Sequence, residues 1–143
     1  MARRPFVTEL EALLEAIYAA PEDDAPRLVY ADALLERGDP RGELIVRQCR
    51  GDAANDLIEE HGDHWLGELA PVLATSTFER GFLATATVRD RALDLEPLIG
   101  HPTWRTVREL RGSAAVALHP SMTALRVLHV AREKSLWHEL LAG

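Results

Sequence analysis

Four acidic and four other polar side chains lie close together in the stretch RLVYADALLERGDPRGE, residues 27–43. Carboxylates gathered in this way could support acid–base catalysis or bind a divalent cation. The alternative is a polar network that holds two helices across a tight turn, in which Asp32 accepts hydrogen bonds from Arg41 or from the following backbone. We favour the network, because helix capping already accounts for half of these residues. The residues concerned are Asp32, Glu36, Asp39 and Glu43, with Arg27, Tyr30, Arg37 and Arg41.

Histidine and cysteine provide the other candidates for chemistry. His61 and His64 are three residues apart, a spacing that could place two zinc ligands on one helical face. We expect Gly62 to break the helix between them, and no third ligand stands at a recognisable spacing, so we predict no metal site. The single cysteine, Cys49, lies in an apolar run and indicates a buried free thiol. With no nucleophile elbow and no glycine-rich phosphate loop, we predict neither a catalytic residue nor a cofactor.

The charge and hydropathy of the chain argue against several classes of partner. Net charge is −7; residues 1–74 hold seven arginines against sixteen acidic residues, whereas residues 75–143 hold nine basic and seven acidic ones. The acidic half would repel phosphate backbones and the other half is only weakly basic, so we do not expect nucleic-acid binding. No stretch reaches the roughly 18 uninterrupted apolar residues of a membrane span, which predicts a soluble, cytoplasmic protein without a membrane partner.

Residues 1–74 carry the apolar spacing of helices. Thr8 and Glu11 have the separation of a capping box at the start of the first helix. Apolar residues then recur three or four positions apart, which predicts about five short helices that bury their stripes together. The fourth helix is expected around 53–61, and the fifth begins near Asp63. The stripes are Leu10, Leu13, Leu14 and Ile17; Leu28, Ala31, Leu34 and Leu35; Leu44, Ile45, Gln48 and Cys49; Leu57, Ile58 and His61; and Trp65, Leu66, Leu69, Val72 and Leu73.

The tetrapeptide RGDP predicts a tight joint between the second and third helices. Gly38 supplies the left-handed residue that closes one helix, Asp39 caps the next, and Pro40 takes its first position. The structural joint predicted here consists of Tyr30, Asp32, Gly38, Asp39, Pro40, Arg41 and Glu43.

After Ala74 the apolar pattern changes to that of strands and repeats. The stretch GFLATATV, residues 81–88, alternates and is rich in threonine, which predicts a strand. The His-Pro pairs at 101 and 119 are 18 residues apart, and the residues after them overlay at the same spacing. Each pair is best explained as a turn device. An L-x-x-L-x-L form emerges in three copies: Leu83, Ala86 and Val88; Val107, Leu110 and Gly112; and Leu125, Leu128 and Val130.

This spacing predicts a leucine-rich-repeat-like stack of three parallel strands. Residues at the L positions point into such a stack, and the residues between them face the open side of the sheet. Because both ends of the stack need covering, we expect the helices before Ala74 at one end and residues 135–143, with Ser135 as N-cap, at the other. The exposed rows are Thr85, Glu109 and Val127; Thr87, Arg111 and His129; and Arg89, Ser113 and Ala131.

The stretch LEAIYAAPEDDAPRLVYADALLERGDPRGELIVRQC resembles the bacterial repeat-companion domain, whose members carry a sequence close to D-x-x-R-L-V-Y-A-D-x-L-x-E-R-G-D-P-R-G-E. The likeness covers about residues 10–49, and the later pieces HGDHWLGELAPVL and FERGFLATATV resemble the segment between the domain and the leucine-rich-repeat-like segments of relatives. Ala33 departs from the pattern, since many relatives have tryptophan there. The resemblance implies an interaction module found beside repeats, without established catalytic activity. The matching residues are Asp24, Arg27, Leu28, Tyr30, Ala31, Asp32, Leu34, Glu36, Gly38, Asp39, Pro40, Gly42 and Glu43.

These patterns together predict an α+β fold: an N-terminal bundle of about five short helices in residues 1–74, packed as one compact unit on a three-stranded repeat-like sheet in residues 75–143. The favoured function is a noncatalytic adaptor that recognises another protein, with self-association left open. The alternative is a small enzyme or ligand-binding regulator that uses the acidic joint around Asp32 and Glu43. The predicted binding face consists of Thr85, Thr87, Arg89, Glu109, Arg111, Val127 and His129.

Overall fold

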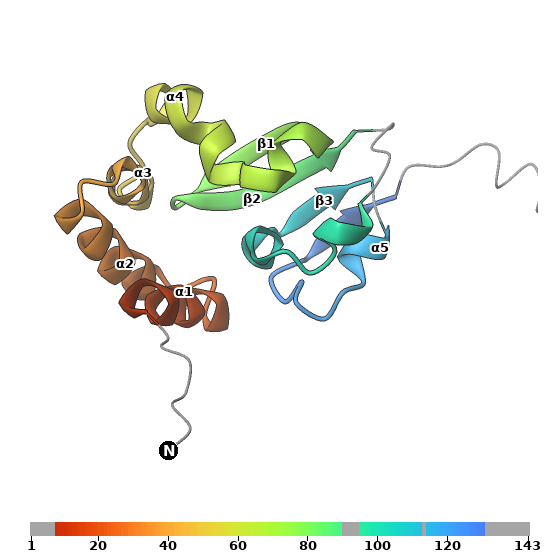
Figure 1. Cartoon of the computed structure of the whole chain (residues 1–143), viewed down its shortest axis with the longest axis horizontal. Coiled ribbons are helices and arrows are strands. Elements are labelled where there is room, and N and C mark those ends of the chain that lie inside the picture. Colours follow the sequence, from red (N-terminus) through yellow and green to blue (C-terminus); the bar gives the residue numbers. More distant parts are fainter. Residues whose placement is uncertain (1–7, 90–94, 113, 131–143) are drawn as a thin grey trace, which may run out of the picture.

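Helices form most of the first half of the chain, and a four-stranded sheet comes after them (Figure 1). The computed structural model describes residues 8–89, 95–112 and 114–130. Its helices are α1 (Glu9–Ala19), α2 (Asp24–Glu36), α3 (Pro40–Cys49), α4 (Asn55–Leu66) and α5 (Ala114–Ala117). Its strands are β1 (Leu73–Glu79), β2 (Phe82–Val88), β3 (Glu109–Arg111) and β4 (Val127–His129), and its 3-10 helices are η1 (Gly67–Val72), η2 (Glu96–Leu98) and η3 (Pro102–Thr106). The predicted α+β class is confirmed.

The helix starts agree with the capping residues in the sequence. At α1 the Thr8 hydroxyl accepts a hydrogen bond from the backbone N–H of Glu11 at 3.2 Å, and the Glu11 carboxylate accepts one from the Thr8 N–H, so the capping box is confirmed. Gly38 has a φ of 71° and lies between α2 and α3. Asp39 then accepts a hydrogen bond from the Arg41 N–H at 3.0 Å, and Pro40 is the first residue of α3. The predicted joint is therefore built from these residues.

Helix α4 corrects the prediction of two helices separated at Gly62. The helix runs through Gly62 without interruption and ends at Gly67, whose φ is 56°. A Cβ atom on Gly62 would lie 3.3 Å from the Ile58 side chain of the same helix and 3.9 Å from the Phe78 ring of β1, which is an ordinary contact distance. Residues 67–72 form a single 3-10 segment, and the expected fifth helix gives way to β1 at Leu73.

The sheet has four strands in the order β1–β2–β3–β4, so the prediction of three strands was wrong in number. Strands β2, β3 and β4 are parallel as predicted, and their register pairs Thr85 with Glu109 and Glu109 with Val127. Strand β1 is the addition, and it pairs antiparallel with β2. The sheet is therefore mixed, with the sequence boundary after residue 74 falling inside β1.

A two-residue turn joins β1 to β2. Arg80 and Gly81 both have positive φ, 50° and 83°, which suits a tight hairpin whose twist matches that of its strands. Helices α1, α2 and α3 gather around the tip of this hairpin (Figure 1). The expectation that helices before Ala74 cover one edge of the parallel stack is wrong. Strand β1 takes that edge instead, because its backbone pairs with β2.

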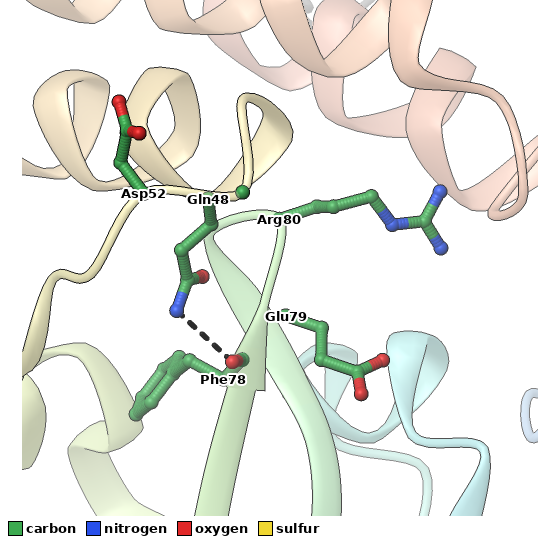
Figure 2. A pocket seen from close by; sticks show the side chains of 6 residues that line it. Gln48, Asp52, Phe78, Glu79 and Arg80 are labelled. Carbon is green, nitrogen blue, oxygen red and sulfur yellow. Dashed lines mark hydrogen bonds between the residues drawn. The ribbon is translucent and has the colours of Figure 1, made fainter.

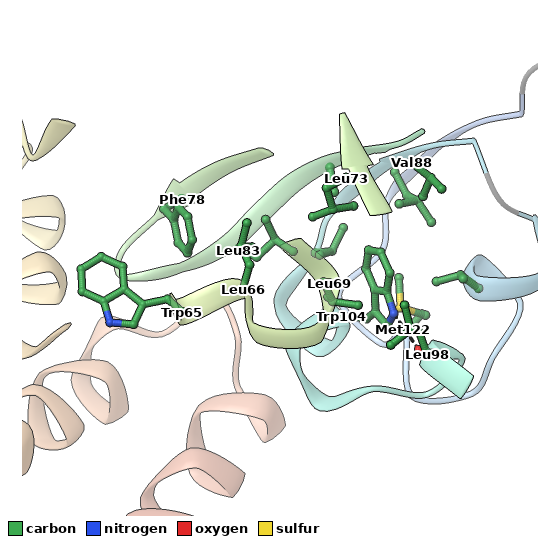
Figure 3. Packing of buried hydrophobic residues seen from close by; sticks show 14 of the residues in the cluster. Trp65, Leu66, Leu69, Leu73, Phe78, Leu83, Val88, Leu98, Trp104 and Met122 are labelled. Carbon is green, nitrogen blue, oxygen red and sulfur yellow. Dashed lines mark hydrogen bonds between the residues drawn. The ribbon is translucent and has the colours of Figure 1, made fainter. Parts of the chain in front are cut away.

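Two apolar clusters replace the single bundle core expected from the helical stripes. Helices α1–α3 bury their side chains together with one residue of the sheet, Phe82. Helix α4 and η1 instead pack with Trp104 under the inner face of the sheet (Figure 3). Leu28 and Leu35, predicted to be buried, are 40% and 48% exposed, because Ala31 and Leu34 supply the buried face of α2.

The two His-Pro pairs form equivalent turns, as predicted. The Nδ1 atoms of His101 and His119 accept hydrogen bonds from the backbone N–H two residues later, at 3.2 and 3.1 Å. The residues after them, Trp104 and Met122, are both buried. His119 also lies against Gly100, where a Cβ would come within 2.9 Å of the imidazole. Successive turns therefore stack on each other and bring β3 and β4 into register.

Burial decreases toward the far edge of the sheet. The L-position residues of the first two copies are buried, including Leu110 at 0% exposure, apart from the half-buried Gly112. In the third copy Leu128 and Val130 are 37% and 56% exposed, which differs from the predicted burial, because β4 lies at the edge of the described sheet. The expected capping segment 135–143, and the row residues Ser113 and Ala131, lie outside the described residues.

Candidate functional site

The predicted binding face is one continuous surface of the sheet. The register places Thr85 beside Glu109, and Thr87 beside Arg111, while β4 adds Val127 and His129 to these rows. The residues that alternate with them along the strands, such as Ala86 and Leu110, are buried on the opposite face. We call the outward-facing set the sheet face, and it consists of Thr85, Thr87, Arg89, Glu109, Arg111, Val127 and His129.

Glu109 is the centre of the charged part of the sheet face. His129 Nε2 lies 3.0 Å from a carboxylate oxygen of Glu109, and an Arg111 guanidinium nitrogen lies 3.9 Å from the same oxygen. The Arg111 side chain is nevertheless 57% exposed, and that of His129 is 45% exposed. Because exposed ion pairs contribute little free energy, Arg111 can turn toward a partner at small cost.

Strand β1 extends the sheet face with two threonines that sequence reasoning missed. Thr75 pairs with Thr87 and Thr77 with Thr85, and the hydroxyl oxygens of Thr77 and Thr85 are 2.6 Å apart. The alternating TST of residues 75–77 was the available signal, but it came directly after an apolar pattern that predicts a helix. The result is a polar surface of four threonines next to the charged residues.

Charge separates the sheet face from the rest of the chain. Its charged members are Arg89, Arg111 and Glu109, a balance of +1, whereas the whole chain has a net charge of −7. Arg89 is exposed, and its backbone N–H donates to Val72 O at 2.8 Å, which continues the sheet beyond β2. A partner that presents carboxylates would meet the guanidinium groups of Arg89 and Arg111.

The arginines of the sequence motif bind a backbone turn. Arg27 donates to Arg80 O at 3.2 Å and to Pro21 O at 2.7 Å, and Arg41 Nε donates to Gly81 O at 3.1 Å. Gln48 donates to Phe78 O at 3.0 Å (Figure 2) and accepts from the Gly81 N–H at 2.8 Å. We call Arg27, Arg41 and Gln48, with the adjacent Ile45, the turn-binding site.

The ring of Phe82 is the side chain next to the turn that packs against the turn-binding site. The guanidinium carbons of Arg27 and Arg41 lie 5.0 and 4.5 Å from the centre of its ring. The ring of Tyr30 is 6.0 Å away and tilted. Burial lowers the pKa of Arg27 to about 10, with neighbouring Arg80 as a second cause, so the group stays protonated at neutral pH. Burial also lowers the pKa of Arg41 and raises that of Tyr30.

The four carboxylates of the motif have separate surroundings. Asp32 is exposed and makes no hydrogen bond or ion pair within the described ranges, so the predicted bond from Arg41 is wrong. Arg41 is instead turned toward Gly81, because its guanidinium is drawn to a carbonyl and an aromatic ring. Asp39 caps α3 and Glu43 pairs with Arg47 at 2.7 Å. Glu36 is exposed at the end of α2.

The histidines and the cysteine that were considered for metal binding or catalysis are not arranged for either role. His61 lies 5.3 Å from the ring of Trp65, and His64 is exposed on the same helix. Over the part of the chain that the structure describes, no three histidine, cysteine or acidic side chains form a metal-binding group. Cys49 is only partly buried, and burial raises the pKa of its thiol, which makes it a weak nucleophile.

A shallow hollow of about 360 Å³ lies beside the hairpin turn (Figure 2). It is lined by Gln48, Gly51, Asp52, Phe78, Glu79 and Arg80. Three of its four polar side chains are already engaged: Gln48 with the turn, Arg80 with Asp24, and Glu79 with Arg108. The fourth, Asp52, is exposed.

No family model, curated protein or solved structure matches the chain. The resemblance to the repeat-companion domain therefore stays a prediction from the quoted residues. None of the described helices combines the length and apolar character that crossing a membrane requires.

Proposed function

We propose that the protein is a noncatalytic adaptor that binds a partner protein through the sheet face. The observation that carries the proposal is the exposed Arg111 guanidinium in the middle of a mostly polar sheet surface. Exposed arginine is typical of protein recognition, since its planar guanidinium offers several hydrogen-bond donors to a partner.

The partner that fits this surface presents carboxylates. Arg89 and Arg111 supply charge-assisted donors, and the four threonine hydroxyls supply neutral donors and acceptors beside them. Glu109 already has partners within the protein, the His129 imidazole at 3.0 Å and the Arg111 guanidinium at 3.9 Å from one carboxylate oxygen. An acidic segment of another protein therefore gains more from this face than a basic one does.

The proposed architecture behind this function is a short leucine-rich-repeat-like stack next to a repeat-companion-like helical unit. Two features support it: the equivalent His-Pro turns at 101 and 119, and the parallel register of β2, β3 and β4 at spacings of 24 and 18 residues. In such stacks the open face of the parallel strands is the usual binding surface.

The test is affinity capture of the tagged protein from a lysate of its own source, with mass spectrometry, for wild type and Arg111→Glu. We expect a protein that wild type retains and Arg111→Glu loses, because the substitution places a second carboxylate beside Glu109. The melting temperature should hardly change, since the side chain is exposed.

Arg50→Glu is the matched control. Arg50 is exposed at the end of α3, outside the sheet, and the substitution changes the net charge by the same amount. Loss of the captured protein with both variants would indicate a nonspecific charge effect. Retention of every captured protein by Arg111→Glu would refute the sheet face as the binding surface.

A further inference from the structure

The helical unit recognises the hairpin turn by its backbone. Five bonds join side chains of α2 and α3 to main-chain atoms of residues 78–81: two come from Arg27, one comes from Arg41, and two involve the Gln48 amide. None of these five bonds uses a side chain of the turn, and the one side-chain bond that the turn makes to α2 is the ion pair of Arg80 with Asp24 at 2.9 Å. The turn therefore fits the helices in the way that a bound peptide fits a receptor.

Conformation and one aromatic ring give this recognition its selectivity. A methyl group on Gly81 would overlap the side chain of Ile45, which lies against the turn. The positive φ of Arg80 and Gly81 then presents the carbonyls to Arg27 and Arg41. A chain that fits must carry a tight turn with glycine followed by an aromatic residue, and a second copy of this protein meets that condition.

The segment that joins the turn-binding site to its own turn could allow that turn to leave the site and be replaced by the turn of another chain. Among the described residues, Phe82 is the one residue beyond α3 that belongs to the apolar cluster of α1–α3. Residues 50–53, which lead away from α3, are all exposed. Near this connection the closed arrangement is held by Leu44, which packs in the sheet core, and by the Arg47–Asp56 ion pair at 3.0 Å. Further away, the exposed ion pairs Glu15–Arg105 and Glu22–Arg126 also join the helices to the second half of the chain.

We propose that the turn-binding site also accepts the Arg80–Gly81 turn of a second copy, so that two chains associate by exchanging turns. This interaction is separate from the sheet face, and it needs no contact of Arg111 or His129. Such an exchange is a form of domain swapping, in which two identical chains exchange the same element and make the contacts of the single chain between them.

Two complementary variants of the full chain test the exchange. The first, Gln48→Ala with Arg41→Met, weakens the turn-binding site and keeps a normal turn. The second, Gly81→Ala, keeps the site and spoils the turn. Each variant alone should be monomeric by light scattering after size-exclusion chromatography. Their mixture should contain a species with twice the mass of one chain, because one intact site then meets one intact turn.

The control is a chain that carries all three substitutions, mixed with the Gly81→Ala variant. No intact turn is present in this mixture, so a dimer there would mean that another surface is responsible and would overturn the proposal. Absence of a dimer in the complementary mixture would also overturn it.

If Gly81→Ala does not fold on its own, a second readout and a milder variant still test the exchange. Recovery of helical circular dichroism when the two variants are mixed supports exchange, since the incoming turn restores the missing contacts. Phe82→Leu replaces Gly81→Ala in a parallel experiment, because it keeps the turn conformation and removes the ring between Arg27 and Arg41. Monomers and unchanged dichroism in both mixtures would refute exchange.

Discussion

Arg27 is buried and Arg41 is half-buried, and the partners of both cations are carbonyl oxygens and a phenylalanine ring. The sequence suggested a network between these arginines and nearby acids. The actual partners could not be predicted, because the acceptors lie 40 and 53 positions further along the chain and belong to the backbone, which has the same atoms at every residue. The capping roles of Asp39 and Pro40 could be predicted, since they depend only on neighbours in sequence.

Asp32→Asn tests whether the acidic motif contributes to stability. We expect the free energy of unfolding to change by less than about 0.5 kcal/mol, because Asp32 is exposed. Gln48→Ala is the contrast: it should cost about 1–3 kcal/mol, since the Gly81 N–H and the Phe78 carbonyl lose their partner. Urea denaturation measures both. A larger loss for Asp32→Asn than for Gln48→Ala would contradict the assignment of roles.

Two glycines near the joint should respond to alanine for different reasons. Gly38 has open space around it and a φ of 71°, so Gly38→Ala should cost about 1 kcal/mol through backbone strain alone. At Gly42 an added Cβ would lie 2.8 Å from Ala31 O and 2.9 Å from Leu35, so Gly42→Ala should separate α2 from α3 and cost more. Equal losses in thermal unfolding would mean that the joint is built differently.

Among the elements, the hairpin of β1 and β2 connects the two apolar clusters. Its strand β1 escaped prediction because Val72 and Leu73 continue the apolar spacing of α4, and the change of period comes only at the threonines. Helix α4 was divided wrongly because glycine lowers helix stability on average, whereas here the burial of Leu57, Trp65 and Leu66 in the sheet core offsets that cost. The His-Pro turns were predictable, since the repeat shows them twice.

Phe82→Ala should loosen helices α1–α3 more than the sheet. The ring is 3% exposed and lies in the cluster of α1–α3, so its removal should cost about 3–5 kcal/mol. Hydrogen exchange should accelerate first in α2 and α3, whose contacts with the turn weaken. Phe78→Ala is the control, because Phe78 belongs to the sheet cluster and its loss should expose β1 and α4. Identical exchange patterns for the two variants would argue for one undivided core.

Over the whole molecule, the acidic first half of the chain forms ion pairs with the more basic second half. Acids of the helical unit pair with arginines of the repeat segment: Glu15 with Arg105 at 3.0 Å, and Glu22 with Arg126 at 3.2 Å. The charge imbalance was visible in the sequence, but the pairing was not, because it depends on how α1 and α2 lie beside the strands. The parallel register was predicted correctly, because the apolar pattern that begins at Leu83 recurs at Val107 and Leu125 and aligns equivalent residues of the three strands, although the copies are 24 and 18 residues apart.

These ion pairs should contribute little to stability compared with the turn. A double-mutant cycle of Glu22→Ala and Arg126→Ala should give a coupling below about 1 kcal/mol, because both side chains are largely exposed. High salt should reduce the coupling further. A coupling as large as the loss from Gln48→Ala would show that charge, rather than the turn, holds the helices in place.

The affinity of the captured partner for purified wild type, Arg111→Glu and Arg50→Glu tests the sheet face most directly. Titration calorimetry at near-physiological salt would measure it. We predict at least a tenfold weaker Kd for Arg111→Glu, which corresponds to about 1.4 kcal/mol, and no change for Arg50→Glu. Equal affinities for all three proteins would contradict recognition through the sheet face.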